Sequence, residues 1–383
     1  MTFDIMAGLG ALGGGVTGYL IPFLFVLTIV VFFHELGHFL VARWRGIRVL
    51  VFSVGFGPEL IGFNDRRGTR WKLSAVPLGG YVKFLGDDSA ASTPDHDALQ
   101  QMSAEDKRGS FFYKPVGSRA AVVAAGPIAN FVLAIVIFAG IFMLYGKQIS
   151  SARVDAVTPG SAAAEAGFQP GDLVLSIDGV AIESFSDMQR IVSINAGQAL
   201  RIEVDRGGVR QTLTATPALK EIKDSFGNVH RLGVLGISRS PAPQDVRTER
   251  VGPLKALAMG AGETWFVIER TLSYLGGVVA GREAADQLGG PIRIAQVSGQ
   301  VATAGIVALL HLAAVLSVSI GLLNLFPIPL LDGGHLLFYA IEAIRGRPLS
   351  DRAQEMGFRI GLALVLMLMI FATFNDIVHL AGS

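Results

Sequence analysis

The sequence predicts an α-helical polytopic membrane protein that has four transmembrane helices and one small α+β domain inserted between the second and third. Three observations support this fold class. The chain of 383 residues is 51% hydrophobic and only 16% charged, whereas an average soluble domain carries about 25% charged residues. Four apolar runs are long enough to cross a bilayer. The segment 152–240 instead has the turn residues and alternating strands of a soluble domain.

Composition also excludes several kinds of function. The net charge of +1 gives no reason to expect nucleic-acid binding. The chain contains no cysteine, which removes disulfides, thiolate zinc sites and cysteine nucleophiles. Any metal site must therefore be built from His, Asp or Glu.

The four predicted spans cover residues 15–41, 120–145, 305–331 and 357–378. A helix needs about 20 apolar residues to cross the hydrocarbon core, and each run meets this length. No Lys or Arg precedes Arg43, and no cleavage site of small residues follows the first run. We therefore expect the first run to be a retained span and not a secretory signal peptide.

Basic residues predict the orientation of the spans. The loop 42–119 is rich in Lys and Arg, and the loop between the third and fourth spans carries Arg345, Arg347 and Arg352. Short basic loops stay in the cytoplasm. This hypothesis places both termini and the segment 146–304 outside the cytoplasm.

Two segments of the first cytoplasmic loop differ in character. Residues 47–84 read as two strands joined by a turn at NDRRG, and their apolar content next to a span predicts a membrane-reentrant β-hairpin on the cytoplasmic side. Residues 86–110 are polar and predict a flexible loop. The first half of the membrane core would thus cover residues 1–145.

The inserted domain, 152–240, resembles a PDZ domain in the run VTPGSAAAEAGFQPGDLVLSIDGV. Ser161 can cap a first helix that Gly167 ends, and Ser186 can cap a second. A hairpin around Arg206 and two glycines follows. PDZ domains bind extended peptides by adding a strand to a sheet edge. A spacer domain that binds nothing is the alternative.

The segment 250–304 predicts a helical, amphipathic connector, because Glu263, Glu269 and Arg270 make a fifth span unfavourable. The second half of the membrane core would then cover residues 305–383.

The motif HELGH, residues 34–38, interrupts the first apolar run. Residues i and i+4 share one face of a helix, so His34 and His38 can bind one zinc ion while Glu35 acts as general base. Ionisable groups inside a span are costly and mark functional sites. The structural alternative is that these side chains reach from a helix end into the lipid headgroups.

A catalytic zinc ion usually has three protein ligands. Asp332, in the run NLFPIPLLDGGH that closes the third span, lies at the same predicted depth as His34 and His38 and is the strongest candidate. His335 is expected to turn toward the loop and to be either structural or an outer partner of the metal ligands. The remaining candidates are expected to be structural or solvated: His96, His230, His311, Glu342, Asp376 and His379.

Together, HELGHFLVARWRGIRV, GFGP, GGYVKF, AGPIANF, GPIRIAQ and NLFPIPLLDGGHL resemble the site-2 protease family of intramembrane zinc metalloproteases. The resemblance implies one Zn²⁺ ion bound by His34, His38 and Asp332, with Glu35 activating water. It implies that Gly55 and Gly57 belong to a reentrant β-loop that holds the substrate, and that Asn324 positions the substrate backbone. The best-known members carry two tandem PDZ domains, whereas this chain has room for one.

The sequence therefore predicts a bacterial inner-membrane zinc endopeptidase that cuts the transmembrane segments of single-span proteins near the cytoplasmic face. The family resemblance further implies anti-sigma factors, other regulators or signal-peptide remnants as substrates, cut in regulated intramembrane proteolysis. The PDZ domain would receive peptide C-termini or screen bulky substrates. Two alternatives remain: a catalytically idle PDZ scaffold in the membrane, and a metal transporter whose His and Asp residues line a pathway.

Overall fold

The computed structural model describes residues 16–87, 96–223, 229–240, 246–281, 285 and 289–382. Contacts divide the chain into two compact units. One consists of Met1–Ala139, Leu257–Thr271 and Ala284–Ser383, and the other of Gly140–Ala256 and Leu272–Glu283.

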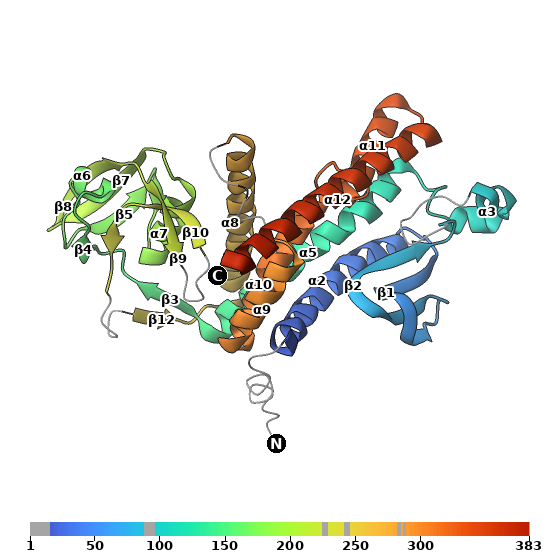
Figure 1. Ribbon diagram of the computed structural model, residues 1–383, viewed down its shortest axis with the longest axis horizontal. Coiled ribbons are helices and arrows are strands. Elements are labelled where there is room, and N and C mark those ends of the chain that lie inside the picture. Colours follow the sequence, from blue (N-terminus) through green and yellow to red (C-terminus); the bar gives the residue numbers. More distant parts are fainter. Residues whose placement is uncertain are drawn as a thin grey trace, which may run out of the picture. The chain divides into compact units, whose positions relative to one another are not determined.

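Four helices within the described residues are long and apolar enough to cross a membrane. They are α2 (Val16–Trp44), α5 (Val116–Tyr145), α10 (Ile306–Asn324) and α12 (Asp351–Gly382) (Figure 1). Helix α2 packs against α10 through Val26, Val30, Leu309 and Ala313. The prediction of a four-span membrane protein is confirmed at this level.

The third span is shorter than predicted. Its helix ends at Asn324 and not at residue 331. Proline lacks a backbone N–H and disfavours helical geometry in the residue before it, so Pro327 and Pro329 prevent the helix from continuing. A new helix, α11 (Asp332–Arg345), begins only after this loop.

The hairpin consists of β1 (Val49–Asn64) and β2 (Arg70–Phe84), which lie beside α2 (Figure 1). Both strands bend, so that Phe52 faces Val82 on one side and Trp71 on the other, while Trp71 also faces Phe63. The result is a sheet of four segments in the order 80–84, 49–54, 70–73 and 61–64. The segment 80–84 forms one edge of this sheet.

The predicted flexible loop 86–110 contains two short helices, α3 (His96–Gln101) and α4 (Ala104–Gly109). Ser103 caps α4 by accepting a hydrogen bond from the Asp106 N–H. Residues 88–95 of this loop lie outside the described residues.

The predicted connector contains two helices, α8 (Pro253–Val279) and α9 (Pro291–Thr303). Asp376 of α12 caps α9, because its carboxylate accepts hydrogen bonds from the N–H groups of Gly290, Ile292 and Arg293. Asp376 thus has the structural role that the sequence predicts.

The second unit is built around a four-stranded sheet in the order β6-β5-β7-β8. These strands are β5 (Leu173–Ile177), β6 (Val180–Ala181), β7 (Leu200–Arg206) and β8 (Val209–Ala215). Three further pairs are β3 (Lys147–Ser150) with β12 (Val246–Glu249), β4 (Ala156–Val157) with β11 (Ile237–Ser238), and β9 (Ala218–Lys223) with β10 (Val229–Val234).

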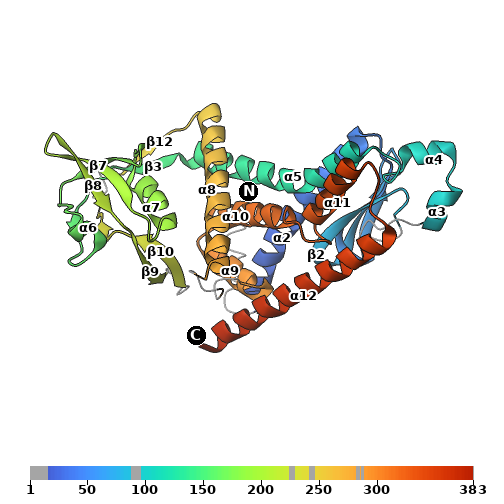
Figure 2. The same ribbon diagram turned by 90° about the horizontal axis from the view of Figure 1, so that it is seen from above.

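The unit also contains α6 (Ala162–Glu165) and α7 (Phe185–Ile194); α7 lies beside the sheet (Figure 2). Ser161 caps α6 as predicted. The predicted cap of α7 is wrong: Ser184, and not Ser186, accepts the hydrogen bond from the Asp187 N–H. The helix begins earlier because Phe185 already packs against the core of the unit.

Candidate metal centre and active site

Helix α2 presents His34 and His38 on one face, one turn apart. Their Nε2 atoms lie 3.2 Å from each other, and the two rings meet edge to face. Gly37, between them, lies so close to α5 that an added Cβ would come within 2.2 Å of the Ala125 carbonyl oxygen. Glycine at this position lets α2 approach α5 closely at the level of both histidines.

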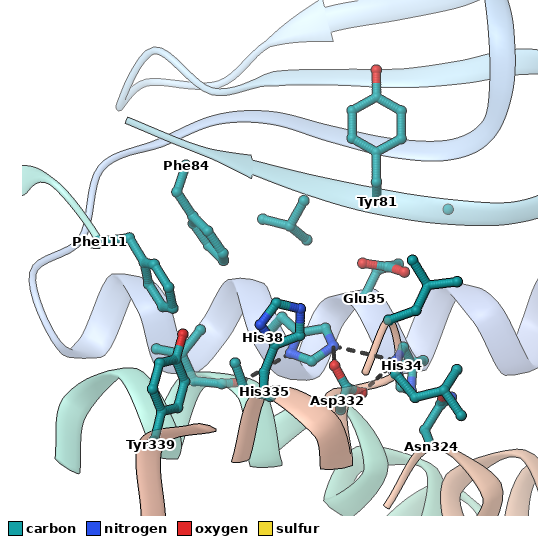
Figure 3. Close-up of a pocket in the computed structure, with 16 residues that line it drawn as sticks. His34, Glu35, His38, Tyr81, Phe84, Phe111, Asn324, Asp332, His335 and Tyr339 are labelled. Carbon is teal, nitrogen blue, oxygen red and sulfur yellow. Dashed lines mark hydrogen bonds and ion pairs between the residues drawn. The ribbon is translucent and has the colours of Figure 1, made fainter. Parts of the chain in front are cut away.

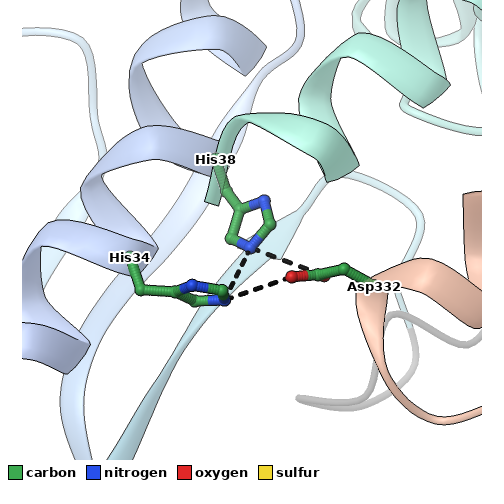
Figure 4. A group of neighbouring side chains, drawn as sticks. All are labelled: His34, His38 and Asp332. Carbon is green, nitrogen blue, oxygen red and sulfur yellow. Dashed lines mark hydrogen bonds and ion pairs between the residues drawn. The ribbon is translucent and has the colours of Figure 1, made fainter. Parts of the chain in front are cut away.

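Asp332, the first residue of α11, completes a group of three side chains (Figure 4). Its Oδ2 lies 3.2 Å from His34 Nε2, and its Oδ1 lies 3.6 Å from His38 Nε2. Two atoms bound to one tetrahedral zinc ion at about 2.0–2.1 Å are about 3.3 Å apart. Asp332 Oδ2 is buried and accepts no hydrogen bond from any described residue. The spacing, donor types and unpaired oxygen fit a metal ion.

Helix α5 lies directly behind the two imidazole rings. The His38 Nδ1–H donates to the Val122 carbonyl oxygen at 2.9 Å, which leaves Nε2 unprotonated for a metal. Four residues further on, a Cβ on Gly126 would come within 2.3 Å of His38 Nε2 and 2.9 Å of His34 Cε1. Another four residues on, the Asn130 side-chain amide lies 3.3 Å from His34 Nδ1.

A cavity of about 220 Å³ opens onto this group (Figure 3). Its lining includes Glu35, Asn324 and residues of the sheet edge, among them Gly80 and Tyr81. A Cβ on Gly80 would meet Glu35 Cγ at 2.9 Å. The Glu35 side chain of α2 therefore packs against the edge segment 80–84 and faces the same cavity as His34, His38 and Asp332.

The loop that leads to Asp332 is packed tightly against glycines. A Cβ added to Gly333 would lie 2.2 Å from the Phe326 carbonyl oxygen, and a Cβ added to Gly334 would lie 2.4 Å from the Ile328 carbonyl oxygen. On α12, an added Cβ on Gly361 would overlap the carbonyl oxygen of Pro329. Leu330 has a φ of +105°, a conformation that costs a non-glycine residue about 1–3 kcal/mol. Packing thus holds Asp332 in place through a strained loop.

We expect Gly361→Ala to weaken metal binding and to lower the thermal unfolding midpoint. Overpacking typically costs about 1–3 kcal/mol, and here it displaces the segment that carries Asp332. Calorimetry and metal titration of the purified protein would measure both effects. Gly140→Ala in α5 is the matched control, because an added Cβ there has no neighbour within 4 Å. Equal behaviour of the two variants would contradict this role of α12.

Gly55 and Gly57 have φ values of +90° and +84°, which favour glycine at the bend of β1. Neither is among the residues that line the cavity, whereas Asn324, the last residue of α10, is. The structure therefore accounts for both glycines by backbone conformation.

The predicted direction of the His335 side chain is wrong. It was expected to turn toward the loop, but α11 begins at Asp332, and residues three apart share a helix face. His335 lines the cavity with Tyr339. Burial raises the pKa of the Tyr339 hydroxyl, and the guanidinium of Arg119 lies 4.8 Å from its ring centre.

Gly126 and Asn130 also lie at the site, although the sequence predicts no role for either; both belong to the run AGPIANF. A polar Asn in the middle of an apolar span was the available signal, since such residues usually have a functional partner.

Comparisons with known proteins place the chain in a family. The model of peptidase family M50 matches residues 22–368. A candidate zinc metalloprotease of Agrobacterium fabrum is 54% identical over 378 residues, which cover 99% of each chain. The metalloprotease MmpA of Caulobacter vibrioides is 43% identical over 381 residues, covering 94% of this chain and 95% of the relative.

Among solved structures, the PDZ domain of an SdrC-like protein from Listeria monocytogenes aligns with 22% of this chain and 83% of its own, at 22% identity and a TM-score of 0.18.

Proposed function

Because the chain belongs to peptidase family M50, the site-2 protease family, we propose that it cuts the transmembrane segments of single-span membrane proteins. It is a zinc metalloendopeptidase of the membrane. The observation that carries the proposal is the convergence of His34, His38 and Asp332 beside Glu35, in a cavity lined in part by the apolar helices α2 and α5.

The proposed zinc ligands are His34 Nε2, His38 Nε2 and a carboxylate oxygen of Asp332. When bound, zinc supplies Lewis-acid chemistry, polarising the scissile carbonyl and lowering the pKa of water toward about 7. Glu35 takes the proton of the attacking water and passes it to the leaving amine. Its position against Gly80 holds the carboxylate at the cavity.

A substrate helix must unwind before it can be cut, because its peptide bonds are enclosed in its own hydrogen bonds. The segment 80–84 pairs with 49–54 on one side only among the described residues, and it lines the cavity. An extended substrate can therefore add as a further strand along this edge. Gly55 and Gly57 shape the same sheet, which we propose to be membrane-reentrant, and Asn324 positions the substrate backbone beside Asp332.

The proposed location is the bacterial inner membrane, with the active site near the cytoplasmic face. Both termini and the second unit would lie outside the cytoplasm, because the basic residues gather in the loops 42–119 and 345–352.

The proposed domains are the membrane core in two halves, 1–145 and 305–383, a PDZ domain at 152–240 and a connector at 250–304. The PDZ domain would bind peptide C-termini or reject substrates whose outer part is bulky. The substrates of the protease would be anti-sigma factors or signal-peptide remnants, already trimmed by another protease in regulated intramembrane proteolysis.

The two alternatives have less support. An idle scaffold has no use for a glutamate held at a two-histidine, one-aspartate group. A transport pathway needs polar groups along the length of the spans, whereas this group converges at one point, with its ligand atoms within 4.8 Å of one another.

The experiment that tests the proposal uses the purified protein in liposomes with two single-span substrates that differ only in the size of the outer domain. Cleavage sites are mapped by mass spectrometry. We expect one cut inside the transmembrane segment, and faster cutting of the substrate with the short outer tail. Cuts confined to soluble segments would contradict intramembrane proteolysis, and equal rates would contradict size selection. Zinc uptake into protein-containing liposomes would favour the transporter.

A further inference from the structure

We propose that Asn130 is the positioning residue for His34: its side-chain Oδ1 accepts a hydrogen bond from His34 Nδ1–H and so leaves Nε2 free to bind the metal. This inference rests on the proposed zinc ligands, and it gives a role to the AGPIANF run of α5.

The location of Asn130 is the first support. Its side chain is fully buried in an apolar span, and its amide lies 3.3 Å from His34 Nδ1. Burying a polar group is costly unless it is hydrogen-bonded. His34 Nδ1 is therefore the partner that offsets this cost.

The direction of the hydrogen bond follows from the position of the metal ligands. His34 Nε2 points at Asp332 Oδ2 and His38 Nε2, both 3.2 Å away. A neutral imidazole carries one proton, so Nε2 can bind a metal only if the proton lies on Nδ1. Nδ1 is then a donor, and Asn130 must present its oxygen to it.

A 180° rotation about the last side-chain bond of asparagine exchanges the amide oxygen and nitrogen and leaves the shape of the side chain almost unchanged. The hydrogen-bond partners therefore decide which of the two orientations is present. With the nitrogen toward His34, Asn130 Oδ1 accepts no hydrogen bond from any described residue. With the oxygen toward His34, the amide supports the tautomer that ligation requires. The metal therefore favours the second orientation.

The backbone around Asn130 is held in place from the other side. Ser317 Oγ of α10 donates to the Asn130 backbone carbonyl oxygen at 2.9 Å, and a Cβ on Gly321 would come within 3.0 Å of Asn130 Cβ. Helix α5 thus fixes both histidines: His38 through the Val122 backbone carbonyl and His34 through the Asn130 side chain. Every residue has a backbone carbonyl, so a substitution at Val122 would not remove the partner of His38, whereas a substitution at Asn130 removes the partner of His34.

The test is zinc affinity by chelator competition, with the visible spectrum of the Co²⁺-loaded protein as a second readout. Asn130→Leu keeps the branching at Cγ and the number of heavy atoms but removes the acceptor, and we expect zinc affinity to fall about 10- to 100-fold, as for other outer partners of metal-binding histidines. Asn130→Asp keeps an acceptor oxygen, and we expect wild-type affinity or higher and an unchanged Co²⁺ spectrum.

Ser319→Ala is the matched control, because Ser319 lies on the same helix as Ser317 but its Oγ donates to the Val315 carbonyl oxygen of α10 itself; we expect no change in zinc affinity. Wild-type affinity in Asn130→Leu, or equal losses in the Leu and Asp variants, would overturn the inference. Asn130→Ala replaces the Leu variant if the latter does not fold. Failure of the wild type itself to bind zinc would instead refute the proposed ligands.

Discussion

Replacing Glu35 by glutamine is expected to lower the cleavage rate by about 10²- to 10⁴-fold, the usual contribution of a general base. Glutamine has nearly the same shape but cannot take a proton from water. Glu35 is not one of the three converging ligands, so we expect Glu35→Gln to retain zinc and the wild-type thermal midpoint. The measurement is the initial rate of cleavage of a single-span substrate, with zinc content determined on the same samples.

Glu355→Gln is a suitable control, because Glu355 is exposed on α12 and pairs only with Arg359 among the described residues. We expect it to cleave at the wild-type rate. Wild-type cleavage by Glu35→Gln would remove the glutamate from the mechanism. Loss of zinc from that variant would show that Glu35 acts through the metal site and not as a base.

Asp332→Asn is expected to lower zinc affinity by more than the roughly 10- to 100-fold cost of losing an outer partner, because it removes a ligand. An amide is neutral and a poor ligand for zinc, which prefers carboxylate, imidazole or thiolate donors. We expect cleavage to be lost at limiting zinc and partly restored by excess zinc. Competition with a chromogenic chelator measures the affinity.

The matched control is Asp351→Asn, since Asp351 occupies the first turn of α12 as Asp332 does in α11. Any loss of helix-dipole stabilisation is then common to both variants, and only Asp332→Asn loses a ligand. Equal zinc affinities of these two variants would exclude Asp332 from the metal site and direct attention to His335, which lines the same cavity.

Local patterns in the sequence were sufficient for several elements. An unbroken apolar run can satisfy its backbone in lipid only as a helix, so the four spans follow from composition. Of the two helix caps predicted in the second unit, Ser161 was right, but Ser186 was wrong, because the start of α7 at Ser184 depends on Phe185 packing into the core. The break of the third span after Asn324 can also be predicted from the sequence, because the prolines that stop the helix are visible in it.

By itself, the sequence determined the chemistry of the site: a helical period of 3.6 residues places His34 and His38 on one face whatever surrounds them. Only the tertiary structure decided which groups meet them. Asp332, Asn130 and Gly126 come from helices far away in the chain, and their contacts depend on how closely those helices pack. Helix periodicity is a property of neighbouring residues, whereas a metal site also requires distant segments to meet within a few ångströms.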